Sequence, residues 1–380
     1  MRARLRAVAA RADLTVVSPV ALLDYANPHK DLLASRRIPT RRRDDSIDVY
    51  HPRWLYPPRG GVANAFFLFA RLLGHVARLG GRHRFDIIDA HYGHPEGIAA
   101  ALLASALRLP FIVTLRGSEL RYQQPARLFW TGWALRRAGC VISVSEGLRE
   151  FALGLGVARE RTRVIPNGIN ADIFHPRDRT EARRKHGIPE DGKVILSAGD
   201  LAELKGHHRI VRAVRALREQ HIEATLLIAG GVGRSGRYAA TLRDIVRECE
   251  LQDAVRFIGE IKQDALADLM AASDVFCLAS SSEGWPNVVN EALACGTPVV
   301  ATNVGAVPQM LASPDCGNIV AVNDHDSLTA GLANALTREW DRDAIARWGG
   351  SRSWDAVADD VLQVIDDVIR EHTRAGASKR

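Results

Sequence analysis

The sequence predicts an α/β protein built from two doubly wound parallel sheets. Short apolar runs rich in β-branched residues recur along the chain, and each is followed by a turn and a helical stretch. This alternation is typical of parallel strands that are buried on both faces. The runs fall into two series, and 380 residues are too many for one core of ordinary size. We therefore expect two domains of this class.

The first series gives five strands in the first half of the chain. They are LTVVSP from Leu14, FDIIDAH from Phe85, FIVTLRG from Phe111, CVISVSE from Cys140 and TRVIPNG from Thr162. A domain of this kind opens with a strand and a tight glycine-bearing turn, whereas this sequence begins inside what reads as the first helix. The first domain therefore lacks its opening strand. Because that loss would leave two unpaired strand edges, we expect the natural chain to start upstream of Met1.

The second series gives six strands, and a closing helix follows it. The strands are KVILSAG from Lys193, ATLLIAGG from Ala224, VRFIGE from Val255, DVFCLASS from Asp274, PVVATNVG from Pro298 and GNIVAV from Gly317. The seam between the two series lies at about 167–189, where turn residues and a charged stretch replace strands. Apolar residues at helical spacing predict a helix over 354–372. The expected domains are 1–175 and 176–355, with a closing helical segment at 356–380.

Composition indicates a soluble globular protein with a preference for anionic partners. The chain is 47% hydrophobic and 25% charged, with a formal net charge of +7. The run RRIPTRRRDD at 36–45 holds much of the excess, and its alternative interpretation is a solvated basic loop. With the aromatics Trp54 and Tyr56, which we expect to be exposed, the run predicts weak attachment to an anionic membrane surface.

Cysteine usage and hydropathy predict a cytoplasmic location, at most peripheral at the inner face of the cell membrane. The five cysteines are scattered without metal-ligand spacing, which fits a reducing compartment. No apolar run reaches the roughly 20 residues of a membrane span. The first residues lack the apolar core of a signal peptide.

The stretch SSSEGWPNVVNEALACGTPVVATNVG, Ser281–Gly305, carries two carboxylates, Glu283 and Glu291. Glu283 lies in the loop at the carboxyl end of a predicted strand, where ligands of open parallel sheets bind. Pro286 suits the first turn of the following helix, and Gly296 suits its end. Free backbone N–H groups at a helix start favour an anion such as phosphate. A carboxylate accepts hydrogen bonds from both hydroxyls of a sugar diol, and the alternative for each glutamate is a solvated side chain.

This stretch resembles the retaining glycosyltransferases of family 4, which have the GT-B fold of two Rossmann-like domains facing across a cleft. Their hallmark is two glutamates separated by seven residues within EG-x-P…EA-x-A-x-G-x-PVV. The resemblance extends to AGDLAELKG, IPNGIN, FDIIDAHYGHPEG and TLRGSE, and so covers nearly the whole chain. Among family members, the sequence is most similar to bacterial enzymes that build cell-surface polysaccharide on lipid carriers.

The resemblance implies a nucleotide sugar as donor. It assigns Glu291 to the ribose hydroxyls, Glu283 to the donor sugar and Lys205 to the leaving diphosphate. Lys205 also has a physical rationale, because a fixed ammonium stabilises a departing diphosphate, although an exposed surface lysine is the alternative. Asp200 departs from the family, which places an arginine or asparagine there, and a carboxylate would repel a diphosphate. The remaining residues implied on the donor side are Gly284, Trp285, Pro286, Asn287 and Asp200.

Arg116 is implied on the first-domain side, where many relatives have a histidine or arginine facing the donor phosphate and the acceptor. A structural salt bridge is the alternative for Arg116. His91 and Asn167 are the other acceptor-side candidates, and His91 is equally plausible as a core histidine. No metal or other cofactor is implied, because no Asp-x-Asp pair follows a strand.

The prediction is thus a metal-independent, retaining transferase that acts on a lipid-linked or growing surface glycan, with no role for nucleic acid. The alternatives are a sugar-nucleotide epimerase or a phosphorylase of the same architecture, and a degenerate protein that binds sugar nucleotides without transfer.

Overall fold

The computed structural model describes residues 1–23, 33–45, 47–81, 83–121, 124–232 and 236–377. The chain forms two compact units, Met1–Gly168 together with Trp354–Arg380, and Ile169–Ser353. The boundaries expected at 175 and 355 thus differ from the observed crossings after 168 and 353. The final helix is part of the first unit and is not a segment of its own.

The first unit contains three separate sheets in its described residues. Strands β6 (Ile88–His91), β7 (Phe111–Leu115), β8 (Cys140–Ser143) and β9 (Thr162–Val164) form a parallel sheet in that order. A second sheet has the order β1-β4-β3, from β1 (Thr15–Val17), β4 (Ile47–Tyr50) and β3 (Arg41–Asp44). The two-residue strands β2 (Val20–Ala21) and β5 (Arg53–Trp54) pair with each other.

Strands β1 and β6 each pair with one neighbour in these sheets, β4 and β7 respectively. Arg4 links helix α1 (Arg2–Ala9) to the β6–β7 sheet, donating to Asp89 Oδ2 at 2.8 Å and to Thr114 Oγ1 at 2.9 Å. The expectation of an additional strand upstream stays a prediction.

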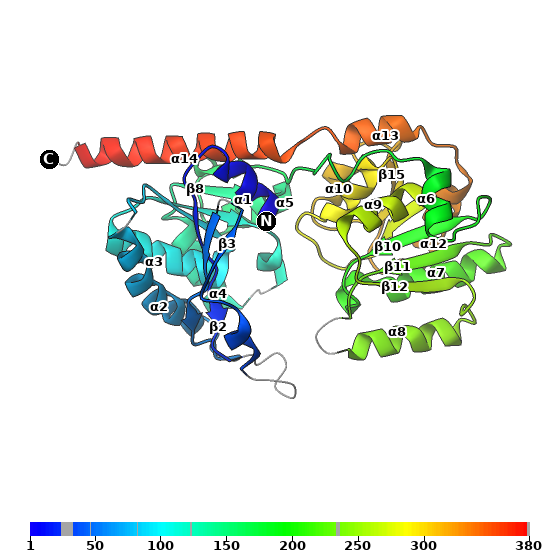
Figure 1. Ribbon diagram of the computed structural model, residues 1–380, viewed down its shortest axis with the longest axis horizontal. Helices are drawn as coiled ribbons and strands as arrows, with labels where there is room; N and C mark the ends of the chain where they lie inside the picture. Colours follow the sequence, from blue (N-terminus) through cyan, green and yellow to red (C-terminus); the bar gives the residue numbers. More distant parts are fainter. Residues whose placement is uncertain (24–32, 46, 82, 122–123, 233–235, 378–380) are drawn as a thin grey trace. The chain divides into compact units, whose positions relative to one another are not determined.

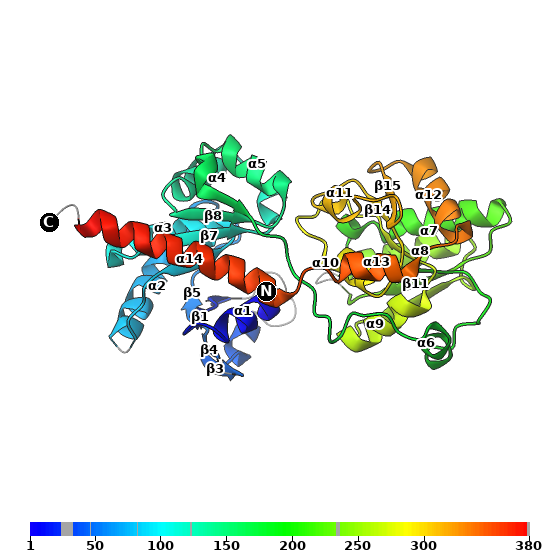
Figure 2. The ribbon, with the colours of Figure 1, turned by 90° about the horizontal axis from the view of Figure 1, so that it is seen from above.

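The helices of the first unit are α1, α2 (Ala63–Gly80), α3 (Ile98–Leu107), α4 (Pro125–Leu135), α5 (Glu146–Gly154) and α14 (Trp354–Ala377). Figure 2 shows α14 running beside α1. Val8 of α1 packs with Val357 and Val361 of α14 over the sheet residues Ile112 and Ile142. Apolar burial therefore ties the last helix of the chain to the first unit.

The second unit holds one six-stranded parallel sheet with the order β12-β11-β10-β13-β14-β15. Counted along the unit, this is the order 3-2-1-4-5-6 of a doubly wound fold. The strands are β10 (Val194–Ala198), β11 (Thr225–Ala229), β12 (Val255–Gly259), β13 (Val275–Leu278), β14 (Val299–Thr302) and β15 (Gly317–Val320). Its helices are α6 (Arg179–Lys185), α7 (His207–Glu219), α8 (Arg237–Glu248), α9 (Gln263–Ala272), α10 (Asn287–Ala294), α11 (Val307–Met310), α12 (His325–Thr337) and α13 (Arg342–Gly349).

Helices cover both faces of this sheet (Figure 1). Alternate residues of β10 serve the two faces: Leu196 packs in a core with α9 and α10, and Ile195 packs in a core with α7, α8 and α12. All five residues of β10 are buried. The continuous apolar runs in the sequence are therefore central strands, as expected.

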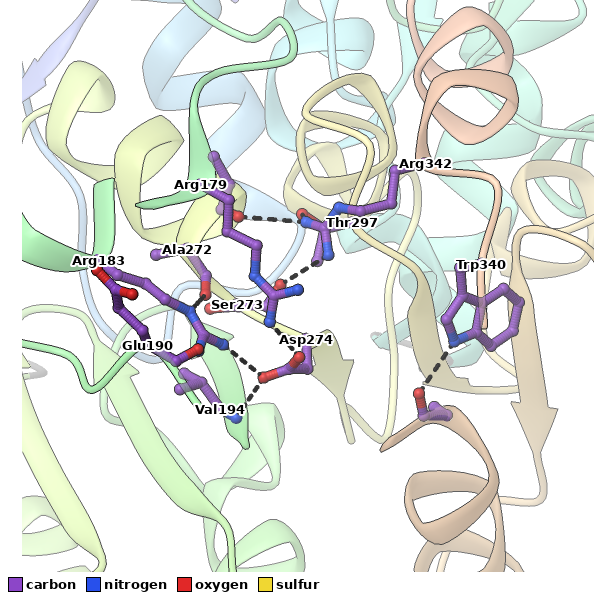
Figure 3. Close-up of polar contacts among 12 residues, drawn as sticks. Arg179, Arg183, Glu190, Val194, Ala272, Ser273, Asp274, Thr297, Trp340 and Arg342 are labelled. Carbon is purple, nitrogen blue, oxygen red and sulfur yellow. Dashed lines mark hydrogen bonds and ion pairs between the residues drawn. The ribbon is translucent and has the colours of Figure 1, made fainter. Parts of the chain in front are cut away.

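A buried arginine joins α6 to the start of β13 (Figure 3). The Arg183 side chain is 2% exposed. Its guanidinium donates to Asp274 Oδ2 at 2.8 Å and to the carbonyl oxygens of Ala272 and Pro189, each at 2.9 Å. Nearby, Arg342 of α13 donates to the carbonyl oxygen of Ser273 at 3.1 Å. These cations anchor α6 and α13 at the amino ends of the strands, opposite to the carboxyl ends.

The basic run at 36–45 adopts a different structure from the expected loop. Arg41–Asp44 form the exposed edge strand β3, and Arg41 pairs with Asp48 of β4 at 3.0 Å. The prediction that Trp54 is exposed is wrong: this residue is 8% exposed and packs against Leu68 and Leu72 of α2. Tyr56 is 39% exposed, as expected. None of the helices among the described residues is both long and apolar enough to cross a membrane.

Candidate active site

The candidate site of the second unit lies where the strand order reverses. Chain connections leave β10 and β13, two neighbouring strands at the centre of the sheet, in opposite directions. Their carboxyl-end loops therefore diverge, and in open parallel sheets ligands bind at such a point. Lys205 lies in the loop that follows β10, and Glu283 lies in the loop that follows β13. The topology thus brings together two side chains that are 78 positions apart.

Lys205 and Glu283 form an ion pair. Lys205 Nζ donates to Glu283 Oε1 at 2.7 Å, and the side chains are 25% and 10% exposed. Each charge is thus partly withdrawn from water and held by the other. This arrangement fixes an ammonium group and a carboxylate side by side, one suited to phosphate oxygens and the other to sugar hydroxyls.

Glycines let the loops around this pair come close to one another. Gly206 has φ +70°, and a Cβ there would lie 2.0 Å from the carbonyl oxygen of Ala279. Gly305 has φ +54°, and a Cβ there would lie 2.4 Å from the carbonyl oxygen of Glu283. Only glycine fits both the backbone conformation and the space at these positions. The loop that carries Glu283 is held further by the N–H of Ala306, which donates to the carbonyl oxygen of Gly284 at 3.0 Å.

Glu291 lies in the second turn of α10, which runs from Asn287 to Ala294 as expected and ends before Gly296 at φ +77°. Burial raises the pKa of the Glu291 carboxyl to about 7. Within the part of the chain that the structure describes, no protein group donates a hydrogen bond to it. A half-buried carboxyl without a partner is costly to keep in an apolar helix, and this cost is typical of a group that a ligand satisfies.

The other expected donor-side residues surround the start of α10. Gly284 and Pro286 are buried, and Pro286 is the N-cap residue that precedes the first helical turn. Trp285 packs against the core under α9 and α10, and its indole Nε1 is buried without a hydrogen-bond partner. Asn287 is exposed at the helix start. Asp200 is also exposed, in the loop after β10, so its carboxylate stands in solvent at the same edge of the sheet.

His207 is a site residue that the sequence analysis missed. It is 1% exposed at the start of α7, and its ring lies 3.0 Å from Ser197 Oγ and 3.3 Å from the carbonyl oxygen of Gly199. Burial lowers its pKa to about 4, so the ring is neutral at pH 7. Because a carbonyl only accepts, Nε2 carries the proton and Nδ1 accepts from Ser197. The ring thereby fixes both ends of the loop that carries Lys205.

In the first unit, the structure brings Arg116 and His91 together at the carboxyl ends of β7 and β6. Arg116 Nε donates to His91 Nδ1 at 2.9 Å, which makes the ring a neutral acceptor. Burial is the main cause that lowers the pKa of His91 to about 3 and that of Arg116 to about 10. The Arg116 Nη2 atom is buried without a partner. The sequence analysis offered a structural salt bridge as the alternative role of Arg116, whereas the side-chain partner in the structure is a histidine.

Glu119 shapes the loop around Arg116. One carboxylate oxygen accepts from the backbone N–H of Gly117 at 2.8 Å, and the other accepts from Gly93 N–H at 3.0 Å. A small cavity beside it, about 20 Å³, is lined by His94, Ser118, Glu119, Arg127, Leu128, Thr131 and Phe151. Nearby, burial raises the pKa of Glu96 to about 7. The motifs HYGHPEG and TLRGSE, quoted for the resemblance, thus meet in space, although the roles of Glu119 and Glu96 had not been predicted.

Asn167 is 8% exposed and lies next to the last residue of the first unit. Its burial places it in the folded interior at the crossing between the units, which fits a structural position. Its expected acceptor-side role stays a prediction, as do the individual roles of the other site residues.

Comparison with known proteins matches both units to glycosyltransferase family models. The model "Glycosyltransferase Family 4" matches residues 6–173, and "Glycosyl transferases group 1" matches residues 178–352. A D-inositol 3-phosphate glycosyltransferase from Stackebrandtia nassauensis is 32% identical over 320 residues, covering 78% of this chain and 72% of that protein. An N-acetyl-alpha-D-glucosaminyl L-malate synthase from Bacillus anthracis is 27% identical over 290 residues, covering 75% and 73%.

Solved structures share the fold. A sucrose-phosphate synthase from Thermosynechococcus elongatus superposes with a TM-score of 0.77 at 22% identity, covering 97% of this chain and 92% of that one. Anabaena HepE in complex with UDP-glucose superposes with a TM-score of 0.64 at 21% identity, covering 87% and 86%. The two units are Rossmann-like domains, and the Lys205–Glu283 ion pair lies at the switch point of the second, where the strand order reverses. With these comparisons, they define a glycosyltransferase of the GT-B fold. The chain belongs to the family 4 glycosyltransferases.

Proposed function

We propose that this glycosyltransferase moves a sugar from a nucleotide-diphosphate donor to a hydroxyl group of an acceptor, with retention of the anomeric configuration. The observation that carries the proposal is the Lys205–Glu283 pair at the switch point of the second unit. Support for the donor class comes from HepE, which shares the fold and was solved with UDP-glucose. The donor-site residues are Lys205, Glu283 and Glu291 (the donor site).

The donor would be held by three kinds of contact. Lys205 donates to the diphosphate, Glu283 accepts from hydroxyls of the sugar, and Glu291 accepts from the ribose diol. In the structure Lys205 and Glu283 hold each other. A bound donor therefore competes with this pair and offers each partner a new contact of opposite polarity. One charge-assisted hydrogen bond contributes about 1.5–3 kcal/mol.

The proposed chemistry needs no protein nucleophile. The bond between the anomeric carbon and the diphosphate oxygen breaks, and the acceptor hydroxyl attacks from the same face. The acceptor proton passes to a diphosphate oxygen as the new glycosidic bond forms. Lys205 then stabilises the negative charge that grows on the diphosphate, so this role does not require a metal ion.

We place the acceptor on the first unit, near Arg116 and His91. The buried, unpartnered Nη2 of Arg116 offers a donor to an anionic or hydroxylated group. A lipid-linked or growing surface glycan is the proposed acceptor class, in keeping with the resemblance to polysaccharide enzymes. The proposed location is the cytoplasmic side of the cell membrane.

Titration with a panel of nucleotide sugars, followed by a turnover assay with a glycan acceptor, tests the proposal. A transferase binds one donor class and forms a glycoside only when the acceptor is present. An epimerase would release altered sugar without an acceptor, and a degenerate protein would bind without turnover. Either of these outcomes would overturn the proposal.

A further inference from the structure

An aromatic surface of two exposed phenylalanines and two half-buried tryptophans lies on the first unit. Four side chains of helices α2 and α4 form it: Phe66, Phe129, Trp130 and Trp133 (the aromatic surface). The other three rings pack around Trp130, with centroids 5.2 Å apart for Phe66 and Trp130, 5.8 Å for Phe129 and Trp130, and 5.5 Å for Trp130 and Trp133. Phe129 is 64% exposed, the largest exposed fraction among the large apolar side chains described.

The exposed face of α2 extends this surface. Apart from Phe66, its exposed residues over the first four turns are Ala63, Phe67, Ala70, Gly74 and Ala77. These positions follow helical spacing, so they form one apolar stripe that points to solvent. The buried face of the same helix packs Leu68 and Leu72 into the core. An amphipathic helix normally keeps its second face polar, whereas the exposed face of α2 is apolar as far as Arg78, which is exposed in the last turn.

The two sequence segments that carry the aromatic surface have charges of one sign. No Asp or Glu occurs in residues 49–85, which contain α2, or in residues 120–145, which contain α4. The two segments carry Arg53, Arg59, Arg71, Arg78, Arg82, Arg84, Arg121, Arg127, Arg136 and Arg137. Arg137 lies over the Trp133 ring at 4.4 Å. Aromatic rings with an arginine fringe match the boundary between acyl chains and anionic headgroups.

We propose that the aromatic surface docks the protein on an anionic lipid bilayer. A second copy of the chain fits less well, because a two-fold contact would set the acid-free, arginine-rich segments against themselves. Phe129 and the exposed α2 stripe enter the acyl boundary, and Arg136 and Arg137, both exposed, meet the headgroups. This deepens the proposed function, since a lipid-linked acceptor is presented at such a surface, but it does not depend on turnover.

Vesicle flotation of the full chain tests the proposal. We expect binding to vesicles of phosphatidylcholine with phosphatidylglycerol, weaker binding to phosphatidylcholine alone, and loss of binding as salt rises. Phe129→Ser should weaken binding about tenfold, because a Phe side chain is then missing from the acyl boundary. Arg137→Glu should remove the preference for anionic vesicles. The matched controls, Val232→Ser and Arg347→Glu, alter exposed residues of the second unit and should bind like the wild type.

Tryptophan quenching by brominated lipids supplies a second measurement. Quenching should be strong in the wild type and lost in the Trp130→Phe/Trp133→Phe double variant, which keeps its affinity for vesicles. Unchanged binding of Phe129→Ser, or loss of binding in the edge-strand variant Arg42→Glu instead, would overturn the proposal. So would a lipid-free dimer that Phe129→Ser converts to monomers. No donor or acceptor is present in these experiments, so failure here leaves the proposed transfer reaction standing.

Discussion

At the residue scale, Glu291 is a carboxyl group whose protonation changes near neutral pH. Burial raises its pKa from 4.5 to about 7. Only the ionised form accepts from both hydroxyls of a ribose. We therefore predict that nucleoside diphosphate affinity of the wild type rises as pH increases through about 7. Glu291→Gln should bind about 10–100-fold more weakly at pH 8 and show no such rise, as titration calorimetry can measure. Glu371→Gln on α14 is the exposed control, and an equal affinity in both variants would remove the ribose assignment.

The same carboxyl group affects stability with a definite sign. Because its pKa is raised on folding, the folded protein keeps a proton that the unfolded chain releases. Stability should therefore fall as pH rises from about 4.5 to about 7 and level off above. We predict that Glu291→Gln is more stable than the wild type at pH 8 by about 1–3 kcal/mol and equal to it at pH 4. Denaturant unfolding at the two pH values measures this, and a constant difference would show that Glu291 is not the titrating group.

Lys205 tests the charge that the proposed mechanism places on the leaving group. Lys205→Ala should slow transfer about 100-fold or more, because the ammonium acts on charge that grows in the transition state. Lys262→Ala, an exposed lysine of the same unit, should transfer at the wild-type rate. A wild-type rate in Lys205→Ala would leave Lys205 as a surface lysine paired with Glu283.

At the element scale, Gly305 sets the path of the loop after β14 against the loop that carries Glu283. A Cβ at Gly305 would lie 2.4 Å from the carbonyl oxygen of Glu283, and the φ of +54° disfavours a side chain. We predict that Gly305→Ala destabilises the protein by about 1–3 kcal/mol and lowers donor affinity. Gly154→Ala, where a Cβ would meet nothing within 4 Å, is the control. Thermal unfolding and donor titration measure the two effects. If Gly305→Ala changes neither stability nor donor affinity, the close approach of the two loops is not needed.

Helix α6 depends on one buried cation. Arg183→Ala would leave the Asp274 carboxylate and two carbonyl oxygens without this donor, so unfolding should become easier by about 3–5 kcal/mol. The neighbouring Arg184 is exposed, and Arg184→Ala should change stability by less than about 0.5 kcal/mol. Equal unfolding midpoints for the two variants would contradict this account of how α6 is attached.

The prediction of these elements from sequence succeeded where burial dominates. Every one of the eleven apolar runs contains a strand, namely β1 or one of β6 to β15. Strands such as β7, β10 and β14 are buried at every residue, and burial on both faces leaves a continuous apolar run. Strands β2, β3, β4 and β5 were missed, since β2 and β5 have only two residues each, Arg41–Asp44 is charged, and β4 alternates buried and half-buried residues. Trp54 was predicted to be exposed because its partners Leu68 and Leu72 lie in a helix distant in sequence. His207 and Glu119 carry no sequence signal beyond their motifs, since their roles depend on the Ser197 hydroxyl and on backbone atoms that only the fold brings close.

At the scale of the whole molecule, the fold and the family could be predicted because the motif EGWPNVVNEALACGTPVV coincides with the switch point of a 3-2-1-4-5-6 sheet. The contact between Lys205 and Glu283 could not be predicted, because it depends on β10 and β13 being neighbours in the sheet, and local sequence does not determine the strand order. The domain boundaries also differ from expectation, because α14 returns to pack on α1. Tertiary packing thus determines the site contact and the domain boundaries, which local sequence patterns do not specify.

The proposed reaction has a further consequence for the whole protein. If Lys205 supplies the positive charge for the leaving diphosphate, transfer should persist when divalent cations are removed. We predict that a turnover assay with excess EDTA retains at least about half of the rate, and that adding back Mg²⁺ gives little gain. Strict dependence of the rate on Mg²⁺ would contradict the proposed role of Lys205.

The central claim is that a nucleoside diphosphate binds at the switch point of the second unit with its terminal phosphate at Lys205. Titration calorimetry of the wild type and Lys205→Ala with a matched nucleoside diphosphate and monophosphate tests this directly, after ADP, GDP and UDP have been compared. We predict that the wild type binds the diphosphate about tenfold or more tightly than the monophosphate, and that this preference disappears in Lys205→Ala. A preference that is the same in both proteins would contradict the claim.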